Sequence, residues 1–411
     1  MKKVLIITYY WPPAGGPGVQ RWLKLSRYLA DLDVDVHVLT VDPATATYPL
    51  TDKSLLREVG QKLTVHYSKT SELFSLYKKT SGRKEVPFSG FANESDKPGI
   101  RQKLARFARG NFFLPDARKA WNRFAIKKAL EVISRYGIPT IITTSPPHST
   151  QLIGLRLKKT LNIQWLADFR DPWTDIYYYN KMYPTPIARD FDRKLERRVL
   201  EHADKVITVS DDLKSLLLTK SSELDPRKFK VVPNGFDPAD FEGLTKSRTS
   251  KKATILYAGT LTDQYPVEAF LSSLQSSEFS EKLSLKFIGR QDENSRNLLR
   301  RFSSGLDIEV RGYIPKSEIN AELINADILL LVIPEIENNK GILTGKLFDY
   351  LGSGKPVLCI GPTDGDAARI LAGASAGRVF SYANFEGLDG VLHHWLTKDQ
   401  FSPDANKIQQ Y

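Results

Sequence analysis

The chain has 411 residues, which at about 150 residues per domain suggests two or three domains. Hydrophobic residues make up 41% and aromatic residues 10% of it, which excludes a largely disordered chain. A single cysteine excludes an internal disulfide framework and a cysteine-built metal site. The formal net charge of +12 indicates a polyanionic partner: nucleic acid, an anionic membrane or a phosphorylated ligand.

Most of this charge lies in one part of the chain. Between Lys78 and Arg135, 15 Lys and Arg residues accompany five acids, a local net charge of +10. The remaining residues therefore sum to only +2. We interpret the protein as nearly neutral, with one basic insert at about residues 68–115.

Short apolar runs alternate with helical patterns from the start of the chain, as expected for parallel sheets with crossover helices. In the first half, strands are expected at Val4–Thr8, Val34–Thr40, Leu63–Tyr67, Thr140–Thr144, Ile163–Phe169, Lys205–Val209 and Phe229–Val232. Helices are expected at Val19–Leu32, Asp116–Tyr136, Ser149–Leu161 and Ile187–His202. The first run is too short for a signal peptide, and no stretch approaches the ~18 apolar residues of a spanning helix. We therefore expect a cytoplasmic protein.

A polar stretch at residues 242–252 then has the composition of a linker. Beyond it, strands are expected at Thr254–Ala258, Leu283–Ile288, Ile308–Tyr313, Asp327–Ile333, Pro356–Ile360 and Arg378–Phe380. The predicted fold is α/β: two facing Rossmann-like, doubly wound domains with a cleft between them. Residues 1–245 form the first domain and residues 246–411 form the second. The last helix of the chain could pack against the first domain. Ligands of such sheets bind beyond the carboxyl ends of the strands.

Two clusters follow strands of the first domain near its start and middle. Gly15, Gly16 and Gly18 separate the first strand from the first helix, where close backbone approach and unpaired amides suit an anion. A simple tight turn is the alternative. Ser145-Pro146-Pro147-His148 follows the fourth strand. There His148 could orient a substrate hydroxyl or shuttle a proton, unless this segment only caps a helix through Ser145, Ser149 or Thr150.

A third cluster, Asp168-Phe169-Arg170-Asp171-Pro172-Trp173, ends the fifth strand. Charged residues at the end of an apolar strand are costly to bury unless they face a polar cleft or pair with one another. The sequence alone leaves open both a catalytic role and a structural Asp–Arg pair.

The fourth cluster follows the strand Asp327–Ile333. Thr344-Gly345-Lys346 lies in the first turn of a short helix, where free amides and the Lys346 ammonium could hold a diphosphate without a metal. Asp349, three residues further along the same face, could bind ribose hydroxyls. The spacing differs from that of a Walker phosphate loop.

Together these segments resemble a family-four glycosyltransferase with the two-domain GT-B fold. The resemblance rests on Gly15–Gly18, on Val232-Pro233-Asn234-Gly235-Phe236-Asp237, on Tyr257-Ala258-Gly259-Thr260-Leu261 and above all on the segment Thr344–Pro356. Two departures stand out. The family's pair of glutamates would fall on Gly341 and Asp349, and its Arg and Lys after the first donor-domain strand have no counterpart. The chain is more similar to the branch whose helix begins Ser/Thr-x-Lys.

The resemblance implies transfer of a sugar from a nucleoside diphosphate donor to an acceptor hydroxyl, with retention, without a metal and with no other cofactor. It implies catalytic residues Asp171, Arg170 and His148. Diphosphate-binding residues are then Gly15, Gly16, Gly18, Arg290, Thr344, Gly345 and Lys346, and nucleoside-binding residues are Gly259, Thr260, Tyr313 and Asp349. The acceptor is expected to be a cell-surface glycan or a lipid-linked saccharide.

Two other functions remain open: a nucleotide-sugar epimerase of the same fold and, more remotely, a basic nucleic-acid-binding protein, for which no binding motif is found. The stretch from Ile100 to Leu114, with apolar residues among Arg and Lys, predicts an interfacial helix; an ordinary solvated helix is the alternative. It would place the protein peripherally at the inner face of an anionic membrane.

Overall fold

The computed structural model describes residues 2–71, 99–247, 251–397 and 403–411, so residues 72–98 of the predicted basic insert lie outside the description. The chain divides into two compact units, Met1–Val232 and Pro233–Tyr411. The division falls earlier than the expected boundary at residue 245. The reason is that Phe236 and Phe241 pack against the core of the second unit.

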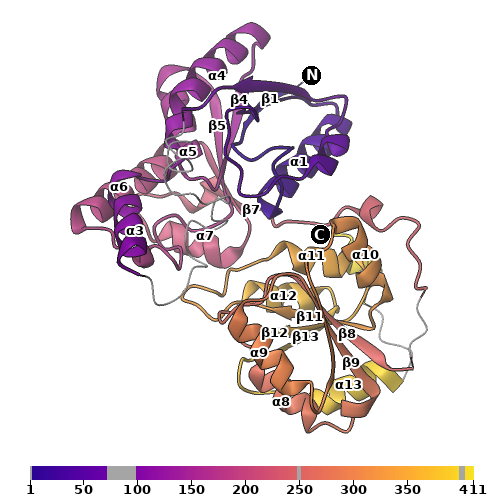
Figure 1. Ribbon diagram of the computed structural model, residues 1–411. Coiled ribbons are helices and arrows are strands. Elements are labelled where there is room, and N and C mark those ends of the chain that lie inside the picture. Colours follow the sequence, from indigo (N-terminus) through magenta and orange to yellow (C-terminus); the bar gives the residue numbers. More distant parts are fainter. Residues whose placement is uncertain (1, 72–98, 248–250, 398–402) are drawn as a thin grey trace. The chain divides into compact units, whose positions relative to one another are not determined.

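The first unit contains a seven-stranded parallel sheet with the strand order β3-β2-β1-β4-β5-β6-β7, between helices (Figure 1). Its strands are β1 (Lys3–Ile7), β2 (Asp35–Val41), β3 (Thr64–Ser68), β4 (Thr140–Ser145), β5 (Gln164–Phe169), β6 (Lys205–Thr208) and β7 (Phe229–Val231). Its helices are α1 (Pro17–Asp31), α3 (Ile100–Phe112), α4 (Asn122–Tyr136), α5 (Ser149–Thr160), α6 (Pro186–His202) and α7 (Asp211–Leu218).

The second unit contains a six-stranded parallel sheet with the order β10-β9-β8-β11-β12-β13. Its strands are β8 (Ala253–Ala258), β9 (Leu283–Ile288), β10 (Asp307–Arg311), β11 (Ile328–Val332), β12 (Val357–Ile360) and β13 (Gly377–Phe380). Its helices are α8 (Glu268–Gln275), α9 (Glu293–Phe302), α10 (Lys316–Asn325), α11 (Gly345–Gly352), α12 (Asp366–Gly373), α13 (Leu388–Thr397) and α14 (Ala405–Ile408). The last helix places Ile408 in the core of this same unit.

Both sheets are covered on both faces, which explains why central strands such as β11 and β12 are apolar throughout. In β1, Leu5 and Ile7 belong to one core cluster, whereas Val4 and Ile6 belong to another. The register places Ile6 opposite Val38 of β2 and Ile142 of β4. The predicted α/β class with two doubly wound sheets is therefore confirmed.

Strand order reverses once in each sheet: between β1 and β4 in the first unit, and between β8 and β11 in the second. At such a point the loops that follow neighbouring strands diverge, which leaves room for a ligand beyond the carboxyl ends of the strands. The two reversal points therefore mark where the candidate site residues should lie.

Candidate functional site

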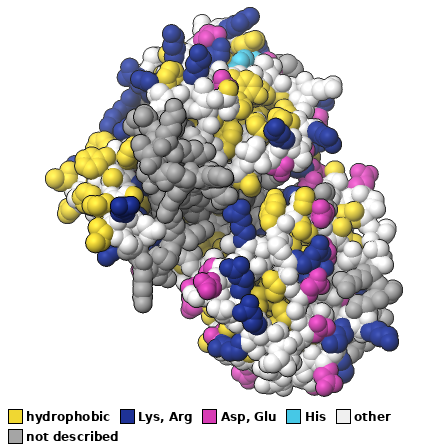
Figure 2. Space-filling view, in the orientation of Figure 1, with side chains coloured by type: hydrophobic (Ala, Val, Ile, Leu, Met, Phe, Trp, Pro, Cys, Tyr) yellow, Lys and Arg dark blue, Asp and Glu magenta, His cyan; other side chains and the backbone are white. Residues whose placement is uncertain are grey.

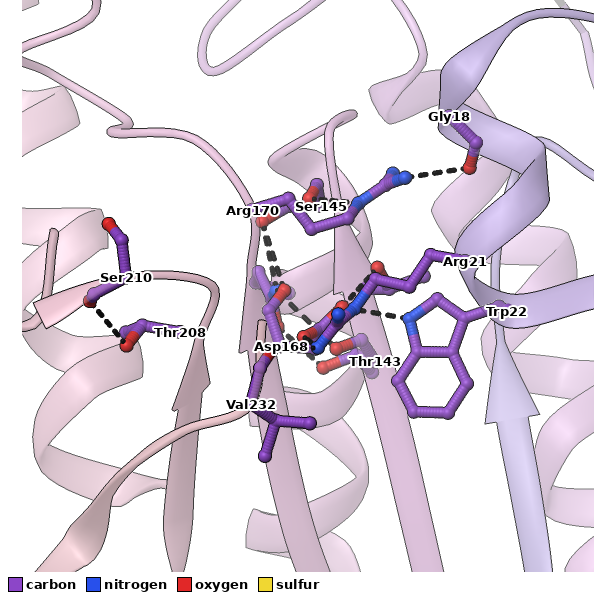
Figure 3. A network of polar contacts seen from close by, with 12 residues as sticks. Gly18, Arg21, Trp22, Thr143, Ser145, Asp168, Arg170, Thr208, Ser210 and Val232 are labelled. Atoms are coloured by element: carbon purple, nitrogen blue, oxygen red, sulfur yellow. Dashed lines mark hydrogen bonds and ion pairs between the residues drawn. The ribbon is translucent and has the colours of Figure 1, made fainter. Parts of the chain in front are cut away.

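Arg170 joins the loops at the reversal point of the first unit. Its guanidinium donates to the carbonyl oxygens of Ser145 (2.9 Å), Pro146 (3.0 Å) and Gly18 (2.7 Å), as Figure 3 shows in part. These acceptors lie after β4 and at the start of α1. All three contacts are to backbone, so Arg170 holds the loops in position. Its predicted direct catalytic role stays a prediction.

Asp168 is the fully buried centre of a polar network that ties α1 to β5 (Figure 3). Its carboxylate accepts hydrogen bonds from Trp22 Nε1 (2.8 Å) and Thr144 Oγ1 (2.8 Å) and pairs with Arg21 (3.2 Å). Arg21 also donates to the carbonyl of Val232, the last residue of the unit. A buried carboxylate needs such partners. The structural Asp–Arg pair therefore exists, but its arginine is Arg21.

Asp171 differs from Asp168 because its carboxylate is half-buried and makes no hydrogen bond or ion pair with the residues that the structure describes. Burial raises its pKa, while the neighbouring Arg170 guanidinium acts in the opposite direction. Asp171 follows the carboxyl end of β5, and its carboxylate oxygens are free to accept a hydrogen bond. Such a carboxylate is suited to bind a hydroxyl.

His148 lies immediately before α5. Its ring is buried and stacks on Trp173, with the ring centroids 5.2 Å apart and an interplanar angle of 14°. Burial, aided by Arg170, lowers its pKa to about 3. The imidazole is therefore neutral at pH 7. A neutral ring is better suited to orient a substrate hydroxyl than to shuttle a proton.

The cap of α5 comes from a residue that the sequence analysis did not consider. Asp116 accepts hydrogen bonds from the Ser149 backbone amide (2.7 Å) and from the Ser149 hydroxyl (2.8 Å). These contacts satisfy the start of the helix, so neither Ser145 nor Thr150 is needed as its cap. A carboxylate 33 residues away gives no local sequence signal.

Helix α6 holds the segment after Asp171 through two buried carboxylates one turn apart. Asp192 accepts from Trp173 Nε1 (2.9 Å) and from the Tyr179 hydroxyl (3.1 Å), and Glu196 accepts from Thr174 Oγ1 (2.6 Å). Burial raises the pKa of Asp192 to about 6. The i, i+4 spacing of the two acids is visible in the sequence. Amphipathic helices commonly have such pairs on their solvent-exposed face, so the spacing alone does not predict that these two are buried.

In the second unit, Lys346 of α11 reaches the loop that follows β8. Its ammonium donates to the Tyr257 hydroxyl (3.0 Å) and lies over the rings of Tyr257 (4.4 Å to the centroid) and Tyr265 (5.4 Å). No ion pair joins it to a carboxylate of the described residues. Burial lowers its pKa to about 8. Lys346 was predicted from the sequence as a site residue, whereas neither tyrosine was predicted to contact it.

The surroundings of Lys346 supply further anion-binding features. Thr344 precedes α11, and its hydroxyl is buried with no hydrogen-bond partner among the described residues. The first amides of a helix also lack intrahelical partners and favour negative charge. Gly259 adopts φ +145° with the Lys346 side chain directly against it. These groups lie at the reversal point of the sheet, as the sequence predicted.

The other predicted donor-binding residues are less closely grouped. Arg290 and Tyr313 are exposed after β9 and β10, and the carbonyl of Thr260 accepts from Tyr257. Asp349 already pairs with Lys316 (2.9 Å). Gly345 is the first residue of α11.

The glycine loop of the first unit supplies fewer free amides than its sequence suggests. The Gly15 amide donates a hydrogen bond to the Leu50 carbonyl oxygen (2.9 Å), and Gly16 adopts φ +92° at the start of α1. The chain therefore turns at Gly15 and Gly16, whereas Gly18 already lies in the first turn of α1. Their predicted contact with a diphosphate stays a prediction.

Comparison with known proteins places these features in a class. Residues 88–240 match the model of the family described as Glycosyltransferase Family 4. No curated protein sequence matches the chain significantly.

Solved structures match nearly the whole chain. Sucrose-phosphate synthase from Thermosynechococcus elongatus is similar with a TM-score of 0.63 at 13% identity, over 100% of this chain and 94% of that one. Anabaena Alr3699/HepE, in complex with UDP and glucose, gives 0.59 at 12% over the same shares. WaaG, a glycosyltransferase involved in lipopolysaccharide biosynthesis, gives 0.55 at 13%, over 99% and 93%.

The two parallel sheets and these likenesses define a two-domain α/β protein with the GT-B fold. The family model covers residues 88–240, less than half of the chain, and these solved structures, at 13% identity or less, show a likeness of fold.

Proposed function

We propose that this enzyme transfers a sugar from a nucleoside diphosphate donor to a hydroxyl of a saccharide acceptor, with retention at the anomeric carbon and without a metal. The acceptor is a cell-surface glycan or a lipid-linked saccharide. Among the solved structures, HepE was crystallised with UDP and glucose, and WaaG acts in lipopolysaccharide biosynthesis. These two proteins support a donor and an acceptor of these kinds.

The observation that carries the proposal is the Lys346 ammonium without a carboxylate partner among the described residues. Lys346 is the second residue of α11, and Thr344 with its free hydroxyl directly precedes the helix, so one helix start at the reversal point of the sheet carries three kinds of donor. A diphosphate carries the negative charge and the oxygen acceptors that these groups lack. As the bond to the sugar breaks, charge grows on the leaving diphosphate, and fixed donors stabilise it most at that moment.

In the first unit, the Asp171 carboxylate and the neutral His148 ring are assigned to the acceptor. The acceptor oxygen bonds to the anomeric carbon, the bond from that carbon to the diphosphate oxygen breaks, and a diphosphate oxygen takes the acceptor proton. Asp171 orients the hydroxyl, while Arg170 and α6 keep the surrounding loops in place. Asp349, Gly259, Thr260 and Tyr313 remain the proposed nucleoside contacts, with Arg290 beside the diphosphate.

A thermal-shift screen of nucleoside diphosphate sugars tests the donor assignment, because a ligand that binds only the folded state stabilises it by RT ln(1 + [L]/Kd). The correct donor should raise Tm in the wild-type protein and raise it far less in Lys346→Ala. Lys282→Ala, an exposed lysine of the same unit, serves as the control and should respond like the wild type. A donor that raises the Tm of Lys346→Ala as much as that of the wild type would overturn the assignment.

Two incubations test the remaining parts of the proposal. Transfer should continue in EDTA, and a strict requirement for Mg²⁺ or Mn²⁺ would overturn the metal-free scheme. An epimerase of the same fold would convert its nucleotide sugar in the absence of an acceptor. Formation of the epimer from UDP-GlcNAc alone would favour that second function.

A further inference from the structure

Exposed apolar side chains gather on one part of the first unit. Of the 15 large hydrophobic residues exposed in the described parts of the chain, eight lie in two short segments, residues 100–113 and 183–191. Ile187 (84% exposed), Ile100 (79%) and Phe112 (77%) are the most exposed among them. Figure 2 shows hydrophobic side chains grouped over α3 and α6, at the left of the view. Isolated exposed apolar residues are ordinary, but a contiguous group marks an interaction surface.

The two segments form one surface because α3 is fixed to the turn before α6. A Cβ on Gly110 would lie 2.3 Å from the Met182 carbonyl oxygen, so helix and turn are in close backbone contact. Asn111 accepts from the Thr185 amide (2.7 Å) and donates to the Tyr183 carbonyl (3.0 Å). These contacts fix the position of α3 relative to α6.

Each helix contributes an apolar stripe at helical spacing. On α3 the stripe is Ile100, Leu104 and Phe107, which follow one another at i, i+4 and i+7, and on α6 it is Ile187 and Phe191. The opposite side of α6 faces inward: Val199 and Leu200 join the core, and Asp192 and Glu196 hold the segment after Asp171. The same helix thus carries the exposed stripe and the support of the candidate catalytic loop.

The charge around the stripes points to one kind of occupant. Helix α3 carries the exposed Arg101 and Lys103 and the partly exposed Arg109, contains no acidic residue, and buries Arg106. On the exposed part of α6, Asp190 is paired with Lys194 (2.7 Å), and Arg193 lies beside them. A second copy of the chain would bring like charges together. An anionic bilayer would pair its headgroup charges with the cations and bury the apolar stripe just below the headgroups.

We propose that the face formed by Ile100, Leu104, Phe107, Tyr183, Ile187 and Phe191, here called the α3–α6 face, docks on the surface of an anionic phospholipid bilayer. This deepens the membrane association expected from the sequence and adds α6, which the sequence analysis did not include. Within the described residues, no helix is both long and apolar enough to cross a bilayer, so the contact is interfacial. Docking would present the Asp171 loop, held by α6, to acceptors carried in the membrane.

Co-sedimentation with vesicles tests the proposal on the full chain. Vesicles of equal parts phosphatidylglycerol and phosphatidylcholine should bind the wild type, and vesicles of phosphatidylcholine alone should bind it much less. Ile187→Ser/Phe191→Ser should lower binding about tenfold or more. Arg101→Gln/Lys103→Gln should lower it about tenfold on the anionic vesicles only. Leu32→Ser/Leu56→Ser, at exposed apolar positions elsewhere in the unit, should bind like the wild type.

Three results would overturn the docking face: equal binding by Ile187→Ser/Phe191→Ser, no vesicle binding by the wild type, or a concentration-dependent dimer that this variant abolishes. Circular dichroism and the donor-induced rise in Tm establish that each variant is folded. Since vesicle binding is measured without donor or acceptor, failure of the docking face and failure of the proposed transfer reaction are separate outcomes.

Discussion

The Lys346 ammonium lies against the Cα of Gly259, so that a Cβ built on this glycine would be 2.5 Å from Nζ. Gly259 also adopts φ +145°, a conformation that residues with a side chain rarely adopt. The loop after β8 and the start of α11 are thus matched to each other. Whatever Lys346 binds depends on the absence of a side chain at residue 259.

Gly259→Ala should therefore weaken donor binding although it leaves every proposed ligand in place. The methyl group displaces Nζ from its position over Tyr257, and the loop must also strain. We expect at least a tenfold rise in donor Kd, measured by calorimetry. Gly243→Ala, also at positive φ but with open space around it, is the control and should affect stability alone. Unchanged donor affinity in Gly259→Ala would show that the position of Lys346 is not critical.

Donor affinity should fall at alkaline pH. Burial lowers the pKa of Lys346 to about 8 in the free enzyme, and the protonated form attracts a diphosphate. As pH rises through 8 the ammonium loses its proton, so binding must take one up and affinity weakens by up to tenfold per pH unit. Calorimetry between pH 7 and 9.5 measures this slope. Lys346→Arg should remove it, because a guanidinium stays charged.

Asp171→Asn should abolish transfer while leaving nucleotide binding intact. The substitution keeps the size of the side chain but removes the charge that orients the acceptor hydroxyl, so kcat should fall by ~10²-fold or more. Transfer is followed with the donor identified by thermal shift, and nucleotide affinity is measured on the same sample. A folded Asp171→Asn variant with near-normal kcat would show that the carboxylate has no part in the reaction.

The sequence predicted the sheets well because both are parallel and buried on both faces. A run such as Ile328–Val332 is apolar at every position, so its strand is visible without any knowledge of its neighbours. Lys346 was found for a similar reason: the helix that it begins has a recognisable local pattern. The structure also confirms a helix within the predicted stretch from Ile100 to Leu114.

Contacts between distant residues could not be predicted in this way. Asp168 pairs with Arg21, 147 positions away, and the predicted partner Arg170 turns instead to backbone carbonyls. The domain boundary was placed too late because Phe236 and Phe241 lie in a stretch of loop composition, and only their packing assigns them to the second unit. Such contacts depend on the tertiary fold, which local composition does not encode.

Asp192→Ala should reduce both stability and turnover. It leaves the Trp173 indole nitrogen and the Tyr179 hydroxyl buried without their acceptor, which costs about 2–4 kcal/mol of unfolding free energy. Because Trp173 stacks on His148, kcat should fall while nucleotide affinity stays unchanged. Urea unfolding and steady-state kinetics measure the two effects. Asp190→Ala, an exposed neighbour on α6, should cost less than about 0.5 kcal/mol and leave kcat unaltered.

The protein should lose stability in mild acid through His66. Its ring stacks on His37 with 2.9 Å between Nε2 and the Nδ1 of His37, and burial together with that neighbour lowers its pKa to about 4. Between pH 6.5 and 4 the unfolded chain binds a proton that the folded chain does not, so unfolding free energy falls as pH decreases through this window. With a half-exposed ring the loss is about 1 kcal/mol. Urea unfolding at pH 7 and pH 5 should show it in the wild type and a smaller loss in His66→Gln. Equal losses in both proteins would assign the acid sensitivity to other groups.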